Sequence, residues 1–165
     1  MNGVAKNWMD RLAYVCHRPA FAGKCAYLVA TVADSPTRHT LRTMNVGLRT
    51  WGFHIVGQAG YKMGALMPQD KVESRYQGEA STIAQALFQA VSQRQFLRPS
   101  FLSLMMFKIQ QGAWQEEDPD SYDYAYWKEK GWFDPRCEFY IAHRANRVKV
   151  ALARFTGAVL AKFVT

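Results

Sequence analysis

Residues 25–57, CAYLVATVADSPTRHTLRTMNVGLRTWGFHIVG, decide the fold. Residues 25–33 form a nearly continuous apolar run, too short for a helix of usual length, which is typical of a strand buried on both faces. A helix is expected next, with Ser35 as its N-cap and a proline at its first position. Gly52 stands where a left-handed C-terminal cap belongs, and residues 53–57 predict a second short strand. This order of elements predicts a βαβ unit with two parallel strands.

Amphipathic patterns predict helices on both sides of this unit. Residues 3–15 carry one apolar stripe at helical spacing, and a further helix is expected from residue 79 to about residue 98. Between them, residues 58–78 contain several glycines and a proline, which predict a long loop with a functional role or high mobility. Beyond a helix near residues 101–109, the last helix is predicted over residues 145–163. Its apolar stripe comprises Val148, Leu152, Phe155, Val159 and Phe163.

Composition places the chain among ordinary globular proteins. Of its 165 residues, 49% are apolar and 21% are charged, which excludes a disordered or collagen-like chain. No apolar run approaches the roughly 18 residues of a membrane-spanning helix, and the first residues lack the layout of a secretory signal. Three scattered cysteines favour reduced thiols over a disulfide framework or a metal site. We therefore expect a cytoplasmic protein.

Charge is unevenly distributed and predicts two regions. The net charge of +8 leaves anionic partners open, among them phosphate ligands, nucleic acid and acidic lipid. Residues 1–97 carry 11 basic and 5 acidic groups, residues 98–143 carry 5 and 8, and residues 144–165 carry 5 and none. We interpret residues 1–97 as the body and residues 98–165 as a helical extension with an acidic aromatic segment and a basic last helix.

A motif near the start indicates a family. Residues 3–12, GVAKNWMDRL, resemble the Gly-x-x-Lys-Asn-(Phe/Trp)-(Ile/Met)-Asp-Arg helix of the flavodoxin-like NAD(P)H-dependent FMN reductase family. The strand after Gly23, the loop of residues 31–37 and the helix of residues 80–91 follow in the family's order. Residues 122–132, YDYAYWKEKGW, look like the C-terminal extension of one subgroup. The resemblance implies a flavodoxin-like three-layer parallel sheet, of which this chain holds the C-terminal portion with about two strands, followed by a helical extension.

The resemblance also marks what precedes the matched region. In the family, a Gly-Ser-Pro-Arg-like loop after the first strand holds the flavin phosphate at a helix N-terminus. This chain begins after that loop, so the resemblance implies an N-terminally truncated member, and loss of the loop would impair FMN binding.

The function implied by the resemblance is that of a flavoprotein oxidoreductase that passes electrons from NAD(P)H through FMN. Ligands of open α/β sheets bind at the carboxyl ends of the strands. The resemblance places no catalytic or metal-ligating side chain here, expects a homodimer, and does not imply nucleic-acid binding. By resemblance, the residues expected around FMN are Asn2, Gly3, Thr31, Ala33, Asp34, Ser35, Thr37, Gly60 and Tyr61.

Other interpretations of the same residues stay open. Residue types alone predict an ordinary strand-to-helix turn at residues 31–37, and Tyr61 is as consistent with packing as with stacking on a ligand. The basic last helix suits an anionic membrane surface, although such helices more often pack against their own domain or a partner subunit. The alternative function is therefore a non-catalytic interaction or membrane-surface module that uses this helix.

Overall fold

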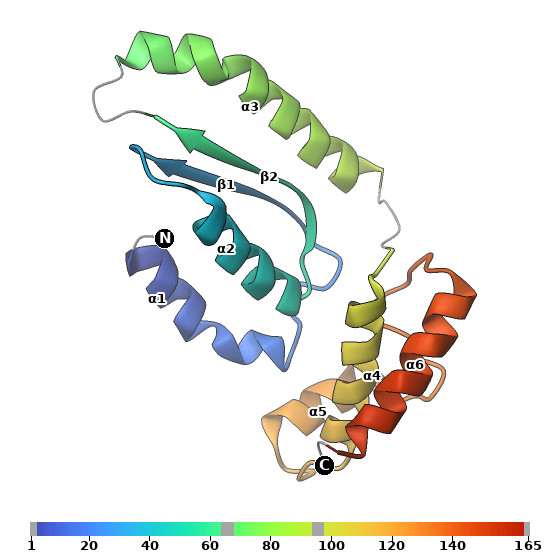
Figure 1. Ribbon diagram of the computed structural model, residues 1–165. Coiled ribbons are helices and arrows are strands. Elements are labelled where there is room, and N and C mark those ends of the chain that lie inside the picture. Colours follow the sequence, from blue (N-terminus) through green and yellow to red (C-terminus); the bar gives the residue numbers. More distant parts are fainter. Residues whose placement is uncertain (1–2, 64–67, 94–97, 164–165) are drawn as a thin grey trace. The chain divides into compact units, whose positions relative to one another are not determined.

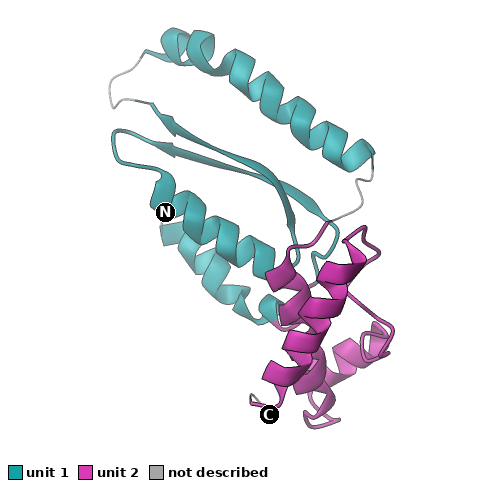
Figure 2. Cartoon of the chain, turned by 45° about the vertical axis from the view of Figure 1, so that its right-hand side comes forward, with its two compact units in different colours: residues 1–16, 20–95 teal, residues 17–19, 96–165 magenta. Residues whose placement is uncertain are grey.

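The computed structural model describes residues 3–63, 68–93 and 98–163, and the chain forms two compact units. Unit 1 consists of Met1–Cys16 and Ala20–Gln95, and unit 2 consists of His17–Pro19 and Phe96–Thr165 (Figure 2). Within the described ranges, none of the helices combines the length and the apolar character needed to cross a bilayer.

Unit 1 is built on a parallel pair of strands. Strand β1 (Cys25–Val32) pairs with β2 (His54–Lys62), with Cys25 beside His54 and Val32 beside Lys62. The predicted parallel pairing is thus confirmed, and the fold is mixed α/β. Helix α2 (Arg38–Thr50) covers one face of this sheet and α3 (Gln69–Ser92) the other (Figure 1). Gly52 has a φ of 100°, the left-handed conformation expected after α2.

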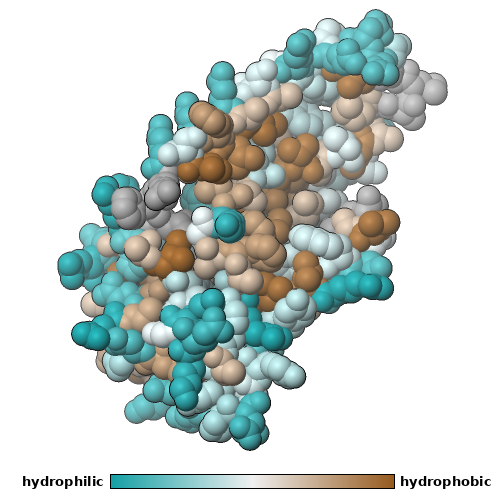
Figure 3. Space-filling view, turned by 180° about the vertical axis from the view of Figure 1, so that it is seen from behind, coloured by the Kyte–Doolittle hydropathy of each residue, from teal (hydrophilic) through white to brown (hydrophobic). Residues whose placement is uncertain are grey.

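The two faces of the sheet are unequally buried. Leu28 and Ala30 of β1 are buried in one cluster with Leu41 of α2. The other face is more open, since Val29 is 45% exposed and, of the described residues of α3, only Ala90 is buried. The prediction of a strand buried on both faces was therefore wrong for the α3 side. A space-filling view from behind shows hydrophobic residues reaching the surface of unit 1 where the sheet lies (Figure 3).

The first helix is shorter than predicted. Helix α1 (Gly3–Arg11) is followed by the 3-10 turn η1 (Ala13–Cys16). Of the predicted stripe, Val15 is buried and Val4 is 81% exposed. Trp8 packs edge-on against Trp51, with 5.2 Å between ring centroids, so α1 rests on the C-terminal end of the α2 segment.

Two boundary predictions were wrong. Ser35 is not an N-cap, because α2 begins at Arg38 with Thr37 in the N-cap position and without a side-chain capping bond. Residues 58–78 are not one loop, because β2 continues to Lys62 and α3 begins at Gln69. The described glycines of this range do not break the elements, since Gly60 lies inside β2 and Gly78 lies inside α3, whereas Gly64 is outside the described residues.

Unit 2 is helical. Its helices are α4 (Phe101–Gln115), α5 (Tyr122–Glu129) and α6 (Arg147–Ala161). The N-cap side chains of Ser100, Ser121 and Asn146 each accept a backbone N–H of the first turn, which stabilises the three helix starts. An aromatic core is formed by side chains of α4, of α5 and of the segment that follows α5. Its most buried members are Phe107, Trp127 and Trp132.

A buried amide joins these elements. Gln111 is 1% exposed, and its Nε2 donates to the carbonyl oxygens of Trp132, at 2.6 Å, and Asp134, at 3.1 Å. Its Oε1 accepts from Lys108 Nζ at 2.6 Å. Each polar atom of this buried side chain therefore has a partner, as buried polar groups require.

Helix α6 presents a different face to the protein than the sequence predicted. The stripe that contains Val148 and Phe155 points outward, whereas the buried positions of α6 are Val150, Ala153, Gly157 and Ala161. These smaller residues pack against α4: an added Cβ at Gly157 would lie 2.8 Å from the backbone oxygen of Met105. Because the α4 backbone comes this close, only the small-residue face fits.

Candidate functional site

Those predicted site residues of unit 1 that the structure describes gather at one end of the sheet. The carboxyl ends of β1 and β2, the beginning of α2 and the beginning of α1 lie at the same end of the unit (Figure 1). This follows from the connectivity, because a parallel pair with one crossover helix brings both strand ends to one edge.

The turn from β1 to α2 forms the middle of this edge. Ala33, Asp34 and Ser35 are exposed, and their small or short side chains leave the backbone of the turn accessible. Met63 N–H donates to the Val32 carbonyl oxygen at 2.8 Å, which extends the strand pairing to the turn. Thr31 lies directly beside Tyr61 in the register.

Thr37 and Gly60 are brought together. A Cβ at residue 60 would overlap the Thr37 side chain, so glycine is required there for the turn to lie against β2. Gly60 therefore leaves room for the Thr37 side chain.

Tyr61 packs against α3. Its ring centroid lies 4.8 Å from that of Tyr76, and the Tyr76 hydroxyl donates to the Lys62 carbonyl oxygen at 2.8 Å. Burial, together with a hydrogen bond to Glu79 and the charge of that carboxylate, raises the pKa of the Tyr61 hydroxyl. These contacts favour the packing role that the sequence left open.

The N-terminal pair of predicted residues is only partly described. Asn2 lies outside the described residues. Gly3 begins α1 and is exposed, and a Cβ built there would meet nothing within 4 Å. Open space therefore exists at Gly3 for a neighbouring molecule.

Two cations at this edge were not predicted. Arg38 is the first residue of α2 and Lys62 is the last of β2, and both are exposed. They directly follow Thr37 and Tyr61, so the strand-end rule that selected those residues would have selected the cations too. An exposed guanidinium and an ammonium suit an anionic ligand group.

Parts of this edge suit a flavin and other parts do not. The accessible backbone of residues 33–35 and the space at Gly3 suit the flat polar rim of its ring system, and Arg38 and Lys62 add positive charge at this edge. Gly60 and Tyr61 fit less well, because Thr37 and Tyr76 already occupy their surroundings. The fit therefore rests on the turn after β1 and on the two cations.

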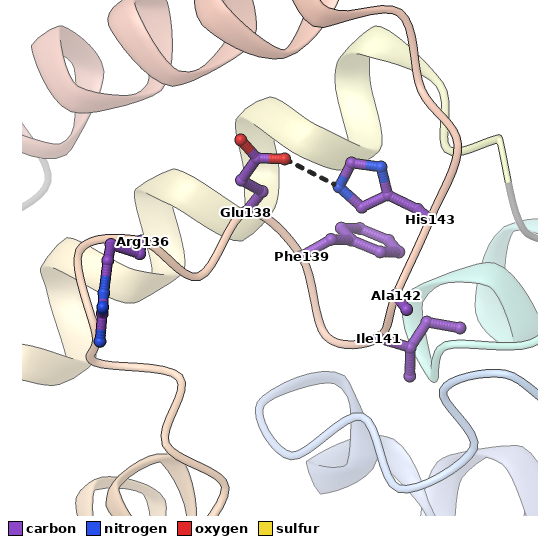
Figure 4. Close-up of a pocket in the computed structure, with 6 residues that line it drawn as sticks. All are labelled: Arg136, Glu138, Phe139, Ile141, Ala142 and His143. Carbon is purple, nitrogen blue, oxygen red and sulfur yellow. Dashed lines mark ion pairs between the residues drawn. The ribbon is translucent and has the colours of Figure 1, made fainter.

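A pocket in unit 2 is the second candidate for a functional site. It has a volume of about 340 Å³ and is lined by Arg136, Glu138, Phe139, Ile141, Ala142 and His143. Figure 4 shows Glu138 and His143 directed toward one another, and their nearest atoms, Oε2 and Nε2, are 3.6 Å apart. His143 Nδ1 accepts the Ala145 N–H at 3.2 Å, which leaves Nε2 as the protonated nitrogen of the neutral ring. Arg136 is paired with Asp134 at 2.9 Å.

The charged groups of this pocket are thus engaged with one another or with the backbone. The Arg136 guanidinium, through its hydrogen bonds, lowers the pKa of Asp134. The arrangement fixes the segment between α5 and α6, and we assign it a structural role.

Comparisons with protein-family models, curated proteins and solved structures gave no match to this chain.

Proposed function

We propose that unit 1 is part of a flavodoxin-like domain that binds FMN at the carboxyl end of β1 and β2 and belongs to a cytoplasmic, homodimeric NAD(P)H-dependent oxidoreductase. The observation that carries the proposal is the turn after β1. It is exposed, has short side chains, and lies at the end of a parallel βαβ unit, the place where such sheets bind ligands. The Lys-Asn-Trp-Met-Asp-Arg motif of α1 supports the same assignment.

Each group at the edge has a distinct part in this proposal. The backbone N–H and C=O groups of residues 33–35 bind the polar rim of the ring, and Ala33 allows close approach. Arg38 and Lys62 supply positive charge for an anionic group of the ligand. Thr37 and Gly60 hold the turn against β2 and so keep these groups in place. FMN held at this edge would supply the chemistry of hydride and electron transfer between NAD(P)H and an acceptor, and the protein would bind and orient the cofactor.

Titration of the full chain with FMN tests the proposal, with quenching of flavin fluorescence as the readout. We expect saturable binding by the wild-type chain. Ala33→Glu places bulk and negative charge at the turn and should weaken the affinity by about tenfold or more, equivalent to about 1.4 kcal/mol. Ala84→Glu makes the same change at an exposed position of α3 and should leave the affinity unchanged.

A chain that fails to quench FMN fluorescence at any concentration would contradict the proposal. So would equal weakening by both variants, because the turn would then have no particular role. Bleaching of bound FMN by NADPH without oxygen tests the redox part separately.

A further inference from the structure

Helix α6 has an apolar outer face that nothing described in unit 2 covers. Val148, Leu152, Phe155 and Val159 recur along this face at helical spacing, and Phe163 extends it by one turn. Phe155 is 70% exposed and Phe163 is 82% exposed. Five large apolar side chains in one line form a continuous apolar surface, which soluble surfaces seldom present without a binding role.

The helix cannot rotate this face inward. Its opposite face meets α4 at Gly157, where the Met105 backbone oxygen and the Lys108 side chain leave no space for a Cβ. Arg154 further fixes the helix, since its Nη1 donates to the Cys137 carbonyl oxygen at 3.0 Å and its Nη2 to that of Pro135. The outward direction of the stripe is therefore built into the packing.

Cations flank the apolar face. At about 100° per residue, Arg147 and Lys162 lie on one side of the stripe and Lys149 on the other. Residues 144–165 contain no acidic side chain, and no described carboxylate forms an ion pair with these three cations. Long basic side chains beside an apolar stripe can extend to lipid headgroups while their stems follow the apolar surface.

We propose that α6 lies in the surface of an anionic membrane, with its apolar stripe among the upper acyl chains and its flanking cations at the headgroups. The helix is about 22 Å long, which suits an interfacial position and not a crossing of the bilayer. A second copy of the chain is disfavoured as the cover of this face, because a symmetric contact between two α6 helices would bring like charges together.

Flotation of the full chain with lipid vesicles tests the proposal. Vesicles of phosphatidylcholine with phosphatidylglycerol should carry about tenfold more protein than vesicles of phosphatidylcholine alone, and added salt should reduce binding. Phe155→Ser should reduce binding to anionic vesicles by about tenfold, because this side chain enters the acyl region. The far-UV circular dichroism of the variant should equal that of the wild type, since Phe155 is not part of the core.

Phe88→Ser is the matched control. Phe88 lies on α3 in unit 1 and is 71% exposed, so the substitution removes an equally exposed ring from another helix. It should leave vesicle binding unchanged. The proposal is overturned if anionic vesicles carry no protein, or if both variants reduce binding equally. It is also overturned if the wild-type chain binds no vesicles and light scattering shows a dimer that Phe155→Ser dissociates. The last outcome would identify a second copy of the chain as the cover.

Discussion

Unit 1 buries mainly aliphatic side chains between a sheet and a helix, whereas unit 2 buries aromatic rings among helices. The core of unit 1 comprises Val15, Leu28, Ala30, Leu41, Leu48, Trp51 and Ile55. In unit 2 the rings of Phe107, Trp127 and Trp132 lie within 5.1 to 5.6 Å of a neighbour in this cluster. Trp127 Nε1 also donates to the His17 carbonyl oxygen at 2.8 Å, so His17–Pro19 belongs to this second core.

The difference shows when an apolar pattern identifies a core. On α2 the apolar residues Leu41 and Leu48, seven positions apart, lie on one face of the helix, and this face is buried against the sheet. On α6 the pattern points the wrong way, because contact with α4 is made by Ala153 and Gly157. A flat sheet accepts large side chains, whereas two closely packed helices select small ones. Residue size therefore decided the buried face of α6.

The largest expected effect is loss of the central ring of unit 2. Trp127→Ala should lower the free energy of unfolding of unit 2 by about 3–5 kcal/mol, because it leaves a cavity among stacked rings and removes the bond to His17. Denaturant unfolding followed by circular dichroism measures the change, and hydrogen exchange locates it in unit 2. Trp51→Ala is the corresponding substitution in unit 1, and it should increase the rate of amide hydrogen exchange in that unit. A cost below about 1 kcal/mol for Trp127→Ala would show that the aromatic cluster is not a core.

Much of unit 1 was predictable because its signals are local. The run of residues 25–33 and the left-handed Gly52 located the strand and the helix end, and the parallel pairing followed. The extension of β2 to Lys62 was not predictable in this way. Gly60 reads as a loop residue in sequence, but in the fold it makes room for Thr37, which is 23 residues away. A contact at that separation leaves no local pattern.

The location of the candidate site was also predictable in part from the sequence. Topology alone brings Thr31, Tyr61 and the turn after β1 to one edge, and the structure has them there. Topology could not predict which side chains pack against these residues. In the structure, Tyr76 of α3 packs against Tyr61. The sequence had assigned residues 69–78, the N-terminal part of α3 that contains Tyr76, to a loop, so this neighbour was not considered.

A pair of glycine substitutions sharpens the contrast between the two units. Gly157→Ala should cost about 1–3 kcal/mol, because its Cβ would lie 2.8 Å from the Met105 backbone oxygen and force α4 and α6 apart. Gly78→Ala makes the same change on α3, where nothing lies within 4 Å, and should gain about 0.5–1 kcal/mol through helix propensity. Urea unfolding of both variants measures whether each substitution lowers or raises the free energy of unfolding. A stabilising effect of Gly157→Ala would mean that α4 and α6 leave room for a methyl group at this position.

The smallest expected effect concerns His54, which begins β2 beside Cys25 in unit 1. Burial, and then the charge of Arg49, lower the pKa of the His54 imidazole below its ordinary 6.5. In the unfolded chain the ring takes up a proton first as the pH falls, so its contribution to stability is fully present above pH 6.5 and is lost as the pH falls toward the folded pKa. His54→Gln should therefore reduce the fall in unfolding free energy between neutral and mildly acidic pH. His39→Gln removes an exposed histidine of α2. It should leave unchanged the pH dependence of the unfolding free energy that is due to His54. Identical slopes in the wild type and His54→Gln would show that this ring is not buried enough to couple its titration to the stability of unit 1.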